Sequence, residues 1–93
     1  MLTLDQELRP HPDAVDTELD ENELALLHLE SKKYYSLNAT GKRIWQGLRH
    51  GRSLREISQR LQDEFQVDAE TADRCVLELV NELVEHNLVQ SAD

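Results

Sequence analysis

A short aromatic segment runs directly into a capped helix within residues 33–48, and this junction limits the possible folds more than any other part of the chain. Tyrosines and a leucine at 34, 35 and 37 suit a pleated strand, predicted over residues 33–37. Asn38 can accept a hydrogen bond from the unpaired amides of a following helix, whose apolar positions are Ile44, Trp45 and Leu48. Gly41 lies in the first helical turn, where it costs about 1 kcal/mol against alanine. We therefore expect this helix to be pressed closely onto its own strand.

Two further strands are predicted before the aromatic one, over residues 14–19 and 24–29. They are joined by a polar turn in which Asn22 can adopt a positive φ. In residues 24–29 both alternating sets are apolar, which favours a sheet contacted on two faces. A helix over residues 23–29 is the main alternative, because this segment contains good helix formers. Strand is preferred, since the aromatic strand needs a partner to be stable.

Two more helices follow, each with its own start signal. Ser53 and Glu56 have the spacing of a capping box, and the helix they begin carries one apolar face of Leu54, Ile57, Leu61 and Phe65. Asp68 caps a longer helix over residues 69–86, closed by Asn87, which tolerates the left-handed conformation. Its core stripe comprises Ala72, Val76, Leu79, Val80 and Leu83. The predicted fold class is α+β, with a three-stranded antiparallel sheet followed by three helices in a winged-helix-like arrangement.

The length of 93 residues allows one domain. We expect residues 1–12, which include Pro10 and Pro12, to be a flexible arm and residues 13–93 to be the domain. The sequence contains neither a long apolar run nor a basic start followed by an apolar segment, so a cytoplasmic protein without a membrane partner is expected. One cysteine fits a reducing compartment.

The charges are divided among three consecutive segments. Residues 1–31 and 61–93 each hold nine acids and one arginine, whereas residues 32–60 hold eight bases and one glutamate. In the simplest interpretation these are solvated faces that maintain solubility. In the alternative, a positive patch beside the aromatic strand suits an acidic peptide or enzyme partner, and its members would be Lys32, Lys33, Lys42 and Arg43.

No catalytic, metal-binding or cofactor-binding motif is evident. The four histidines have no metal-ligand spacing among them or with the cysteine: His11, His28, His50 and His86. Cys75 lies on a helix dominated by carboxylates, which does not lower a thiol pKa. We therefore expect a protein that is not an enzyme and that binds neither metal nor cofactor.

The order and spacing of these elements resemble the PqqD-like family, the small peptide chaperones also called RiPP recognition elements. The resemblance begins with the acidic hairpin at residues 19–29 and continues through the aromatic junction. It then includes Leu54, Glu56, Ile57 and Leu61, and ends with Val76, Leu79, Val80, Leu83, Leu88 and Val89. Two positions depart from the family pattern: Lys32 stands where a turn glycine is usual, and Cys75 where aspartate is common.

The resemblance implies a non-catalytic chaperone that holds the leader of a ribosomally made precursor peptide. The leader would add as a strand along residues 33–37 and lie in a groove against the last helix. The implied partners are the leader peptide and a tailoring enzyme such as a protease, a cyclase or a radical enzyme, and a homodimer is compatible with this role. The candidate peptide-binding residues are Lys33, Tyr34, Tyr35, Ser36, Leu37, Cys75, Leu79 and Glu82. The opposite flank of the last helix, with Leu77 and Asn81, is an alternative wall.

Two other classes of function compete with the peptide chaperone. Residues 54–86 also resemble a helix-turn-helix, so a winged-helix DNA-binding regulator is the main alternative. The would-be recognition helix carries a single arginine, Arg74, against Glu70, Asp73, Glu78, Glu82 and Glu85. Because DNA binding depends on cations near the phosphates, we expect no nucleic-acid partner. A small protein–protein adaptor is the second alternative, and no residue excludes it.

Overall fold

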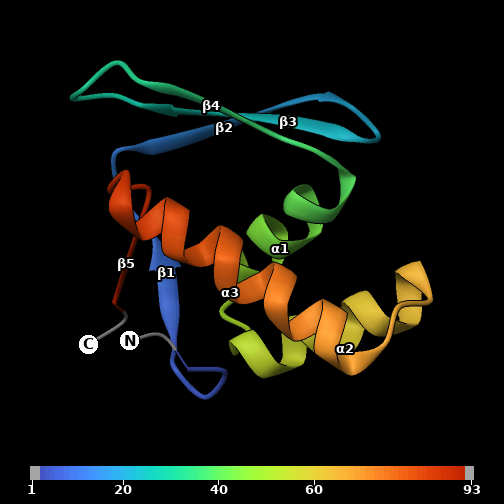
Figure 1. Cartoon of the computed structure of the whole chain (residues 1–93). Helices are drawn as coiled ribbons and strands as arrows, with labels where there is room; N and C mark the ends of the chain where they lie inside the picture. The colour runs from blue at the N-terminus through green and yellow to red at the C-terminus, as the bar shows by residue number, and fades with distance from the viewer. Residues whose placement is uncertain (1–2, 92–93) are drawn as a thin grey trace.

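The computed structural model describes residues 3–91 and places three helices on one side of a three-stranded sheet (Figure 1). The elements in chain order are β1 (Leu8–Pro10), β2 (Ala14–Asp20), β3 (Glu23–His28), β4 (Tyr34–Leu37), α1 (Ala39–Arg49), α2 (Leu54–Phe65), α3 (Ala69–Glu85) and β5 (Val89–Ser91). This confirms the α+β class and the sheet followed by three helices. Within the described residues, no helix is long and apolar enough to cross a membrane.

The larger sheet is antiparallel, with strand order β2-β3-β4. The predicted strand boundaries agree with the structure to within one residue, and the alternative of a helix over residues 23–29 is wrong. In β3 the side chains of Leu24 and Leu26 are buried beneath the sheet, while Leu27 on the other face is half-buried. Because β4 is last in the strand order, it is an edge strand, and it is joined directly to α1.

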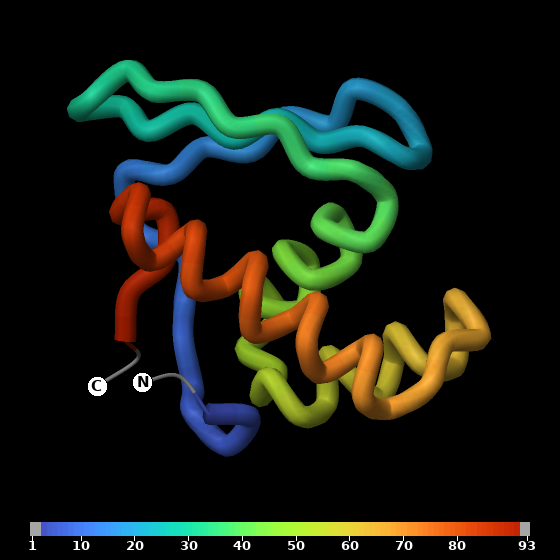
Figure 2. The backbone as a smooth tube through the Cα atoms, in the orientation of Figure 1, coloured from blue at the N-terminus to red at the C-terminus, as the bar shows by residue number. Residues whose placement is uncertain are grey.

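The prediction of a flexible arm over residues 1–12 is wrong for Leu8–Pro10. These residues form β1, which pairs antiparallel with β5 from the other end of the chain. Leu8 is only 4% exposed and belongs to the hydrophobic core. Figure 2 shows β1, in blue, and β5, in red, side by side below the sheet. Burial of Leu8 and pairing with β5 hold this segment in place despite its prolines.

The left-handed conformation occurs at one of the two asparagines where it was predicted, and at Lys32 and Gln66 as well. Lys32 has a φ of 63°, so the turn before β4 keeps the geometry that glycine would favour. Asn87 has a φ of 58° after α3, as predicted. Asn22 is not among the residues with positive φ; its N–H instead donates to Asp20 Oδ1 at 2.7 Å. The Asp20 side chain thus stabilises the β2–β3 turn, and Asn22 does not need the left-handed conformation that was predicted for it.

Side-chain caps begin all three helices, as predicted. Asn38, Ser53 and Asp68 accept hydrogen bonds from the N–H groups three residues later. The second half of the predicted capping box is absent, because the Glu56 carboxylate lies 3.8 Å from the Arg60 guanidinium. Each helix start therefore depends on one short polar side chain.

Helix α1 contributes Ile44, Trp45 and Leu48 to the core and packs against both the sheet and α2. Trp45 is 1% exposed, and its indole N–H donates to Asp16 Oδ2 on β2 at 2.7 Å. On another face of α1, a Cβ added to Gly47 would come within 2.6 Å of Ile57 on α2. The helix pair needs glycine at this position, because no larger residue fits without displacing Ile57. Packing of α1 thus positions both β4 and α2.

Candidate functional site

A groove of about 390 Å³ lies between the edge strand β4 and helix α3. We call it the β4–α3 groove; it is lined by Tyr35, Ser36, Leu37, Asn38, Thr40, Gly41, Ile44, Cys75, Glu78, Leu79 and Glu82. Strand β4 supplies one wall, α3 supplies the other, and the first turns of α1 close it below. The groove therefore lies at the strand-to-helix junction that was identified in the sequence within residues 33–48.

The hydrogen bonds of β3 to its two neighbouring strands show which backbone groups of β4 are free. His28 donates its N–H to the carbonyl of Lys33, and the next residue, Leu29, donates to the carbonyl of Asp13. The donor–acceptor distances are 3.0 and 2.9 Å. Successive residues of β3 thus bond alternately to β4 and to β2, as an antiparallel ladder requires.

The same alternation continues along β4. Tyr35 and Leu37, two and four residues after Lys33, direct their N–H and C=O groups toward β3. The corresponding groups of Tyr34 and Ser36 point away from β3, toward the open edge of the sheet. The edge of β4 therefore offers two residues whose backbone donors and acceptors can pair with an added strand.

The side chains of β4 alternate between the two faces of the sheet. Leu37 is 3% exposed and forms the floor of the groove, while Tyr35, on the same face, is half-buried at one end. Tyr34 points to the opposite face of the sheet and is 62% exposed. An extended chain along this edge would thus contact Tyr35 and Leu37 on the helix side.

A hydrogen bond connects the two walls of the groove. The Tyr35 hydroxyl on β4 donates to the Glu82 carboxylate on α3. This bond, together with burial, raises the pKa of Tyr35 to about 12. The Tyr35 ring also contacts the ring of His86, with 5.6 Å between their centroids. One end of the groove is thereby bounded by a tyrosine held between strand and helix.

Gly41 allows the close approach that its position in the sequence predicted. A Cβ at this position would lie 3.2 Å from Leu37 Cβ and 3.4 Å from Leu79 Cδ2. These distances leave little space for a side chain between the strand and α3. The absence of a side chain at Gly41 therefore leaves space at the bottom of the groove.

Six of the eight predicted site residues line this one groove: Tyr35, Ser36, Leu37, Cys75, Leu79 and Glu82. Lys33 and Tyr34 do not line it. The flank of α3 that faces β4 is the one carrying Cys75 and Leu79, whereas Leu77 and Asn81 lie outside. Sequence analysis did not name Asn38, Thr40, Gly41, Ile44 or Glu78 as site residues. Glu78 could have been found from its helical spacing to Cys75 and Glu82.

The predicted positive patch beside the aromatic strand forms only in part: Lys32 and Lys33 are exposed before β4, but Lys42 and Arg43 do not join them. Lys42 is only 5% exposed, and its Nζ donates to the carbonyl of Asp20 at 2.9 Å and lies 3.5 Å from the Glu18 carboxylate. Arg43 lies outside the groove and pairs with Glu64. The buried ammonium thus bonds to the β2–β3 turn, where it donates to the carbonyls of Asp20 and Glu21. The charged side chains that do line the groove are carboxylates.

Three of the four histidines surround another cavity, of about 320 Å³: His11, His28 and His86. The rings of His11 and His28 have centroids 5.2 Å apart. Among residues 3–91, however, no group of three or more histidines, cysteines or carboxylates could hold a metal ion. Cys75 is a free thiol that lines the groove.

Comparison with known proteins gives matches at two levels. The family model described as coenzyme PQQ synthesis protein D, PqqD, matches residues 23–89. A structure described as TbiB1 in complex with the TbiA(beta) leader peptide has 31% sequence identity and a TM-score of 0.83, covering 91% of this chain and 99% of that one. A lasso peptide synthetase B1 complexed with the leader peptide has 31% identity and a TM-score of 0.81, with coverages of 89% and 96%.

A more distant structure, the heterocyclase TruD, shares the fold at 22% identity and a TM-score of 0.58, and the match covers 90% of this chain but 11% of that one. No protein with a curated description matches. The family match covers β3, β4 and all three helices, which include every element of the groove. The chain belongs to the PqqD-like family, as its sequence predicted.

Proposed function

We propose that this protein is a peptide chaperone that binds the leader of a ribosomally synthesised precursor and presents it to a tailoring enzyme. The leader adds as a fourth strand along β4 and lies in the β4–α3 groove. The observation that carries the proposal is an edge strand with two outward-facing residues beside a groove that the same strand lines. Two structural relatives at 31% identity, both described with a leader peptide, support it.

The proposed binding residues are those of the sequence prediction. The backbone of Tyr34 and Ser36 pairs with the leader, while Tyr35, Leu37 and Leu79 contact leader side chains that alternate toward the groove. Lys33 flanks the strand at the end of the turn. Cys75 and Glu82 form the helix wall.

The groove also favours a particular leader chemistry. Leu37, Ile44 and Leu79 offer apolar contacts, whereas Glu78 and Glu82 offer carboxylates and no lining residue is a cation. A leader whose inward side chains are apolar or basic therefore fits better than an acidic one. This preference is opposite to the one that the sequence suggested.

The same proposal assigns the protein no catalytic role, and it places the protein in the cytoplasm with its precursor and tailoring enzyme. Nucleic acid is not a proposed partner, since α3 carries five carboxylates and one arginine. Dimer formation is not needed, because one chain supplies both walls of the groove.

The test is titration of a fluorescent leader from the precursor encoded beside this chain. Wild-type affinity is expected to be micromolar or tighter, about −8 kcal/mol. Leu79→Asp places a charge in the groove and should weaken binding at least about tenfold. Asn81→Asp is the matched control, because it adds the same charge to the opposite, exposed flank of α3. Equal affinities of folded Leu79→Asp and wild type would show that the leader binds elsewhere.

A further inference from the structure

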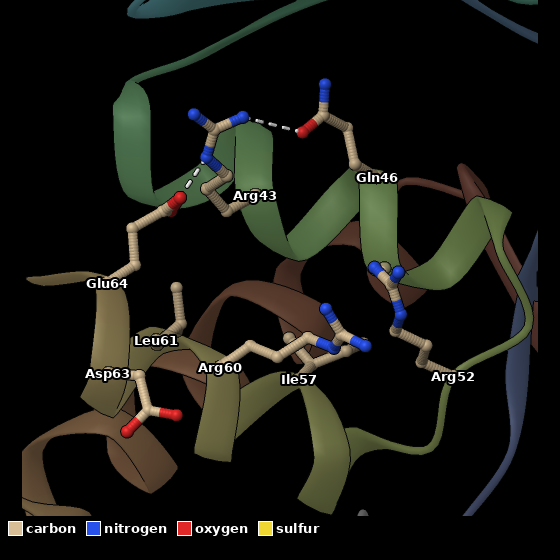
Figure 3. A pocket seen from close by; sticks show the side chains of 9 residues that line it. Arg43, Gln46, Arg52, Ile57, Arg60, Leu61, Asp63 and Glu64 are labelled. Atoms are coloured by element: carbon tan, nitrogen blue, oxygen red, sulfur yellow. Dashed lines mark hydrogen bonds and ion pairs between the residues drawn. The ribbon is translucent and has the colours of Figure 1, made fainter.

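A second cavity, larger than the groove, lies between α1 and α2 (Figure 3). We call it the α1–α2 cleft; its volume is about 470 Å³. Gly47, Ile57 and Leu61 line its bottom, where Ile57 and Leu61 are each 2% exposed. It shares no lining residue with the β4–α3 groove. A ligand in one cavity therefore leaves the residues of the other free.

Three arginines line this cleft, from α1, the α1–α2 turn and α2: Arg43, Arg52 and Arg60. Two carboxylates of α2, Asp63 and Glu64, line it as well. Arg43 already holds a carboxylate, with its Nε 2.7 Å from Glu64 Oε2. Arg60 lies 3.8 Å from Glu56, an exposed pair of little energetic value. The Arg52 guanidinium makes no hydrogen bond or ion pair within the described residues, although the Arg52 backbone N–H donates to the Gly47 carbonyl. In Figure 3 the guanidinium groups of Arg52 and Arg60 both lie over the cleft.

The arginines of the cleft contrast with the negative net charge of the whole molecule. The chain has a net charge of −9, and residues 61–93 alone hold nine acids against one arginine. Of the other cations of the basic segment, Lys42, Arg49 and Arg55 are paired with carboxylates, whereas Lys32 and Lys33 are exposed at the turn before β4. The α1–α2 cleft differs from that turn because it gathers arginines in a cavity, where an anionic partner gains attraction on an otherwise acidic protein.

We propose that the α1–α2 cleft docks an acidic segment of the tailoring enzyme, one that combines carboxylates with apolar side chains. Carboxylates would pair with Arg52 and Arg60, as Glu64 pairs with Arg43, and apolar side chains would fill the rest of the cleft above Ile57 and Leu61. A small anion would use the guanidinium groups but would not fill a cleft of about 470 Å³. The inference rests on the proposed function and adds to it: the leader and the enzyme occupy separate cavities of one chain.

The experiment measures the affinity of the purified tailoring enzyme, encoded beside the precursor, for the full chain loaded with leader. Arg52→Ala combined with Arg60→Ala should weaken enzyme binding about fivefold or more. Arg9→Ala combined with Arg74→Ala is the control, because it removes the same charge from exposed sites outside the cleft. A short peptide of alternating glutamate and leucine should compete with the enzyme, and its lysine–leucine counterpart should not.

Leader affinity is measured first on every variant, so the two proposals fail in different ways. Loss of leader binding in the wild type would contradict the proposed function. Normal leader binding with equal enzyme affinity in both arginine pairs would overturn the docking site. Inorganic phosphate that competes as well as the acidic peptide would also overturn it, because the cleft would then be a small-anion site. An enzyme that binds the loaded chain no better than free leader would overturn it as well.

Discussion

The β4–α3 groove and the α1–α2 cleft are both built on α1, but they offer different chemistry. The groove combines an open strand edge with an apolar floor and carboxylates on its helix wall. The cleft has no strand beside it and is lined by arginines over a helix–helix contact. Backbone groups recognise an extended chain with little dependence on its sequence, whereas guanidinium groups select for charge. The comparison suggests that one small domain separates the holding of a peptide from the choice of a protein partner.

The largest expected effect comes from a substitution in α1, the helix that lines both cavities. Trp45→Ala should lower the free energy of unfolding by about 3–5 kcal/mol, because the indole is buried and hydrogen-bonded to Asp16. This is enough to unfold a marginal domain and so remove both cavities. Chemical denaturation followed by circular dichroism measures it. Trp45→Phe, which keeps an aromatic ring but loses the N–H donor, should cost less; an unchanged midpoint for Trp45→Ala would mean that α1 is not the common support.

A smaller effect is expected at the strand edge alone. Ser36→Pro removes an outward N–H, and proline is tolerated where that donor is unpaired within the sheet. Loss of one hydrogen bond should weaken leader binding about three- to tenfold and leave the enzyme site intact. Ser36→Ala, which retains the N–H, serves as the control. Full leader affinity in folded Ser36→Pro would exclude backbone pairing at this residue.

The smallest expected effect concerns the hydrogen bond across the groove. In a Tyr34→Phe background, absorbance titration reports Tyr35 alone and should give a midpoint near pH 12, above the ordinary 10.0, because the hydroxyl donates to Glu82. Neutral tyrosine is favoured by folding, so its stabilising contribution is complete below about pH 10 and is lost as the pH rises toward 12. Glu82→Gln should move the midpoint back toward 10. A Tyr35 midpoint that Glu82→Gln does not change would disprove the bond in solution.

Much of this fold could be predicted, because its main elements carry local signals. Alternating apolar residues and polar caps gave the three strands of the sheet and the starts of all three helices. The β1–β5 pair could not be predicted in the same way. Each strand has three residues and β1 contains Pro10, so neither shows a periodic pattern, and their pairing depends on ends that are distant in sequence.

The groove was predicted more accurately than its charge. The family resemblance favoured the flank of α3 that carries Cys75, Leu79 and Glu82, which helical spacing alone did not distinguish from the flank with Leu77 and Asn81. The junction at Gly41 indicated where strand and helix meet. Lys42 was misassigned because lysine is usually exposed, and only the tertiary structure brings the carbonyls of the β2–β3 turn around its ammonium. The arginine cleft was missed for a similar reason, since its residues come from two helices and the turn between them.

The most direct test of the account is amide hydrogen exchange of β4, measured by NMR with and without the leader peptide. Without leader, the N–H groups of Tyr34 and Ser36 should exchange freely, while those of Tyr35 and Leu37 should be protected by β3. Addition of leader should slow exchange at Tyr34 and Ser36 by at least about tenfold and leave the other two protected. Bound leader with no added protection at Tyr34 and Ser36 would contradict strand addition at this edge.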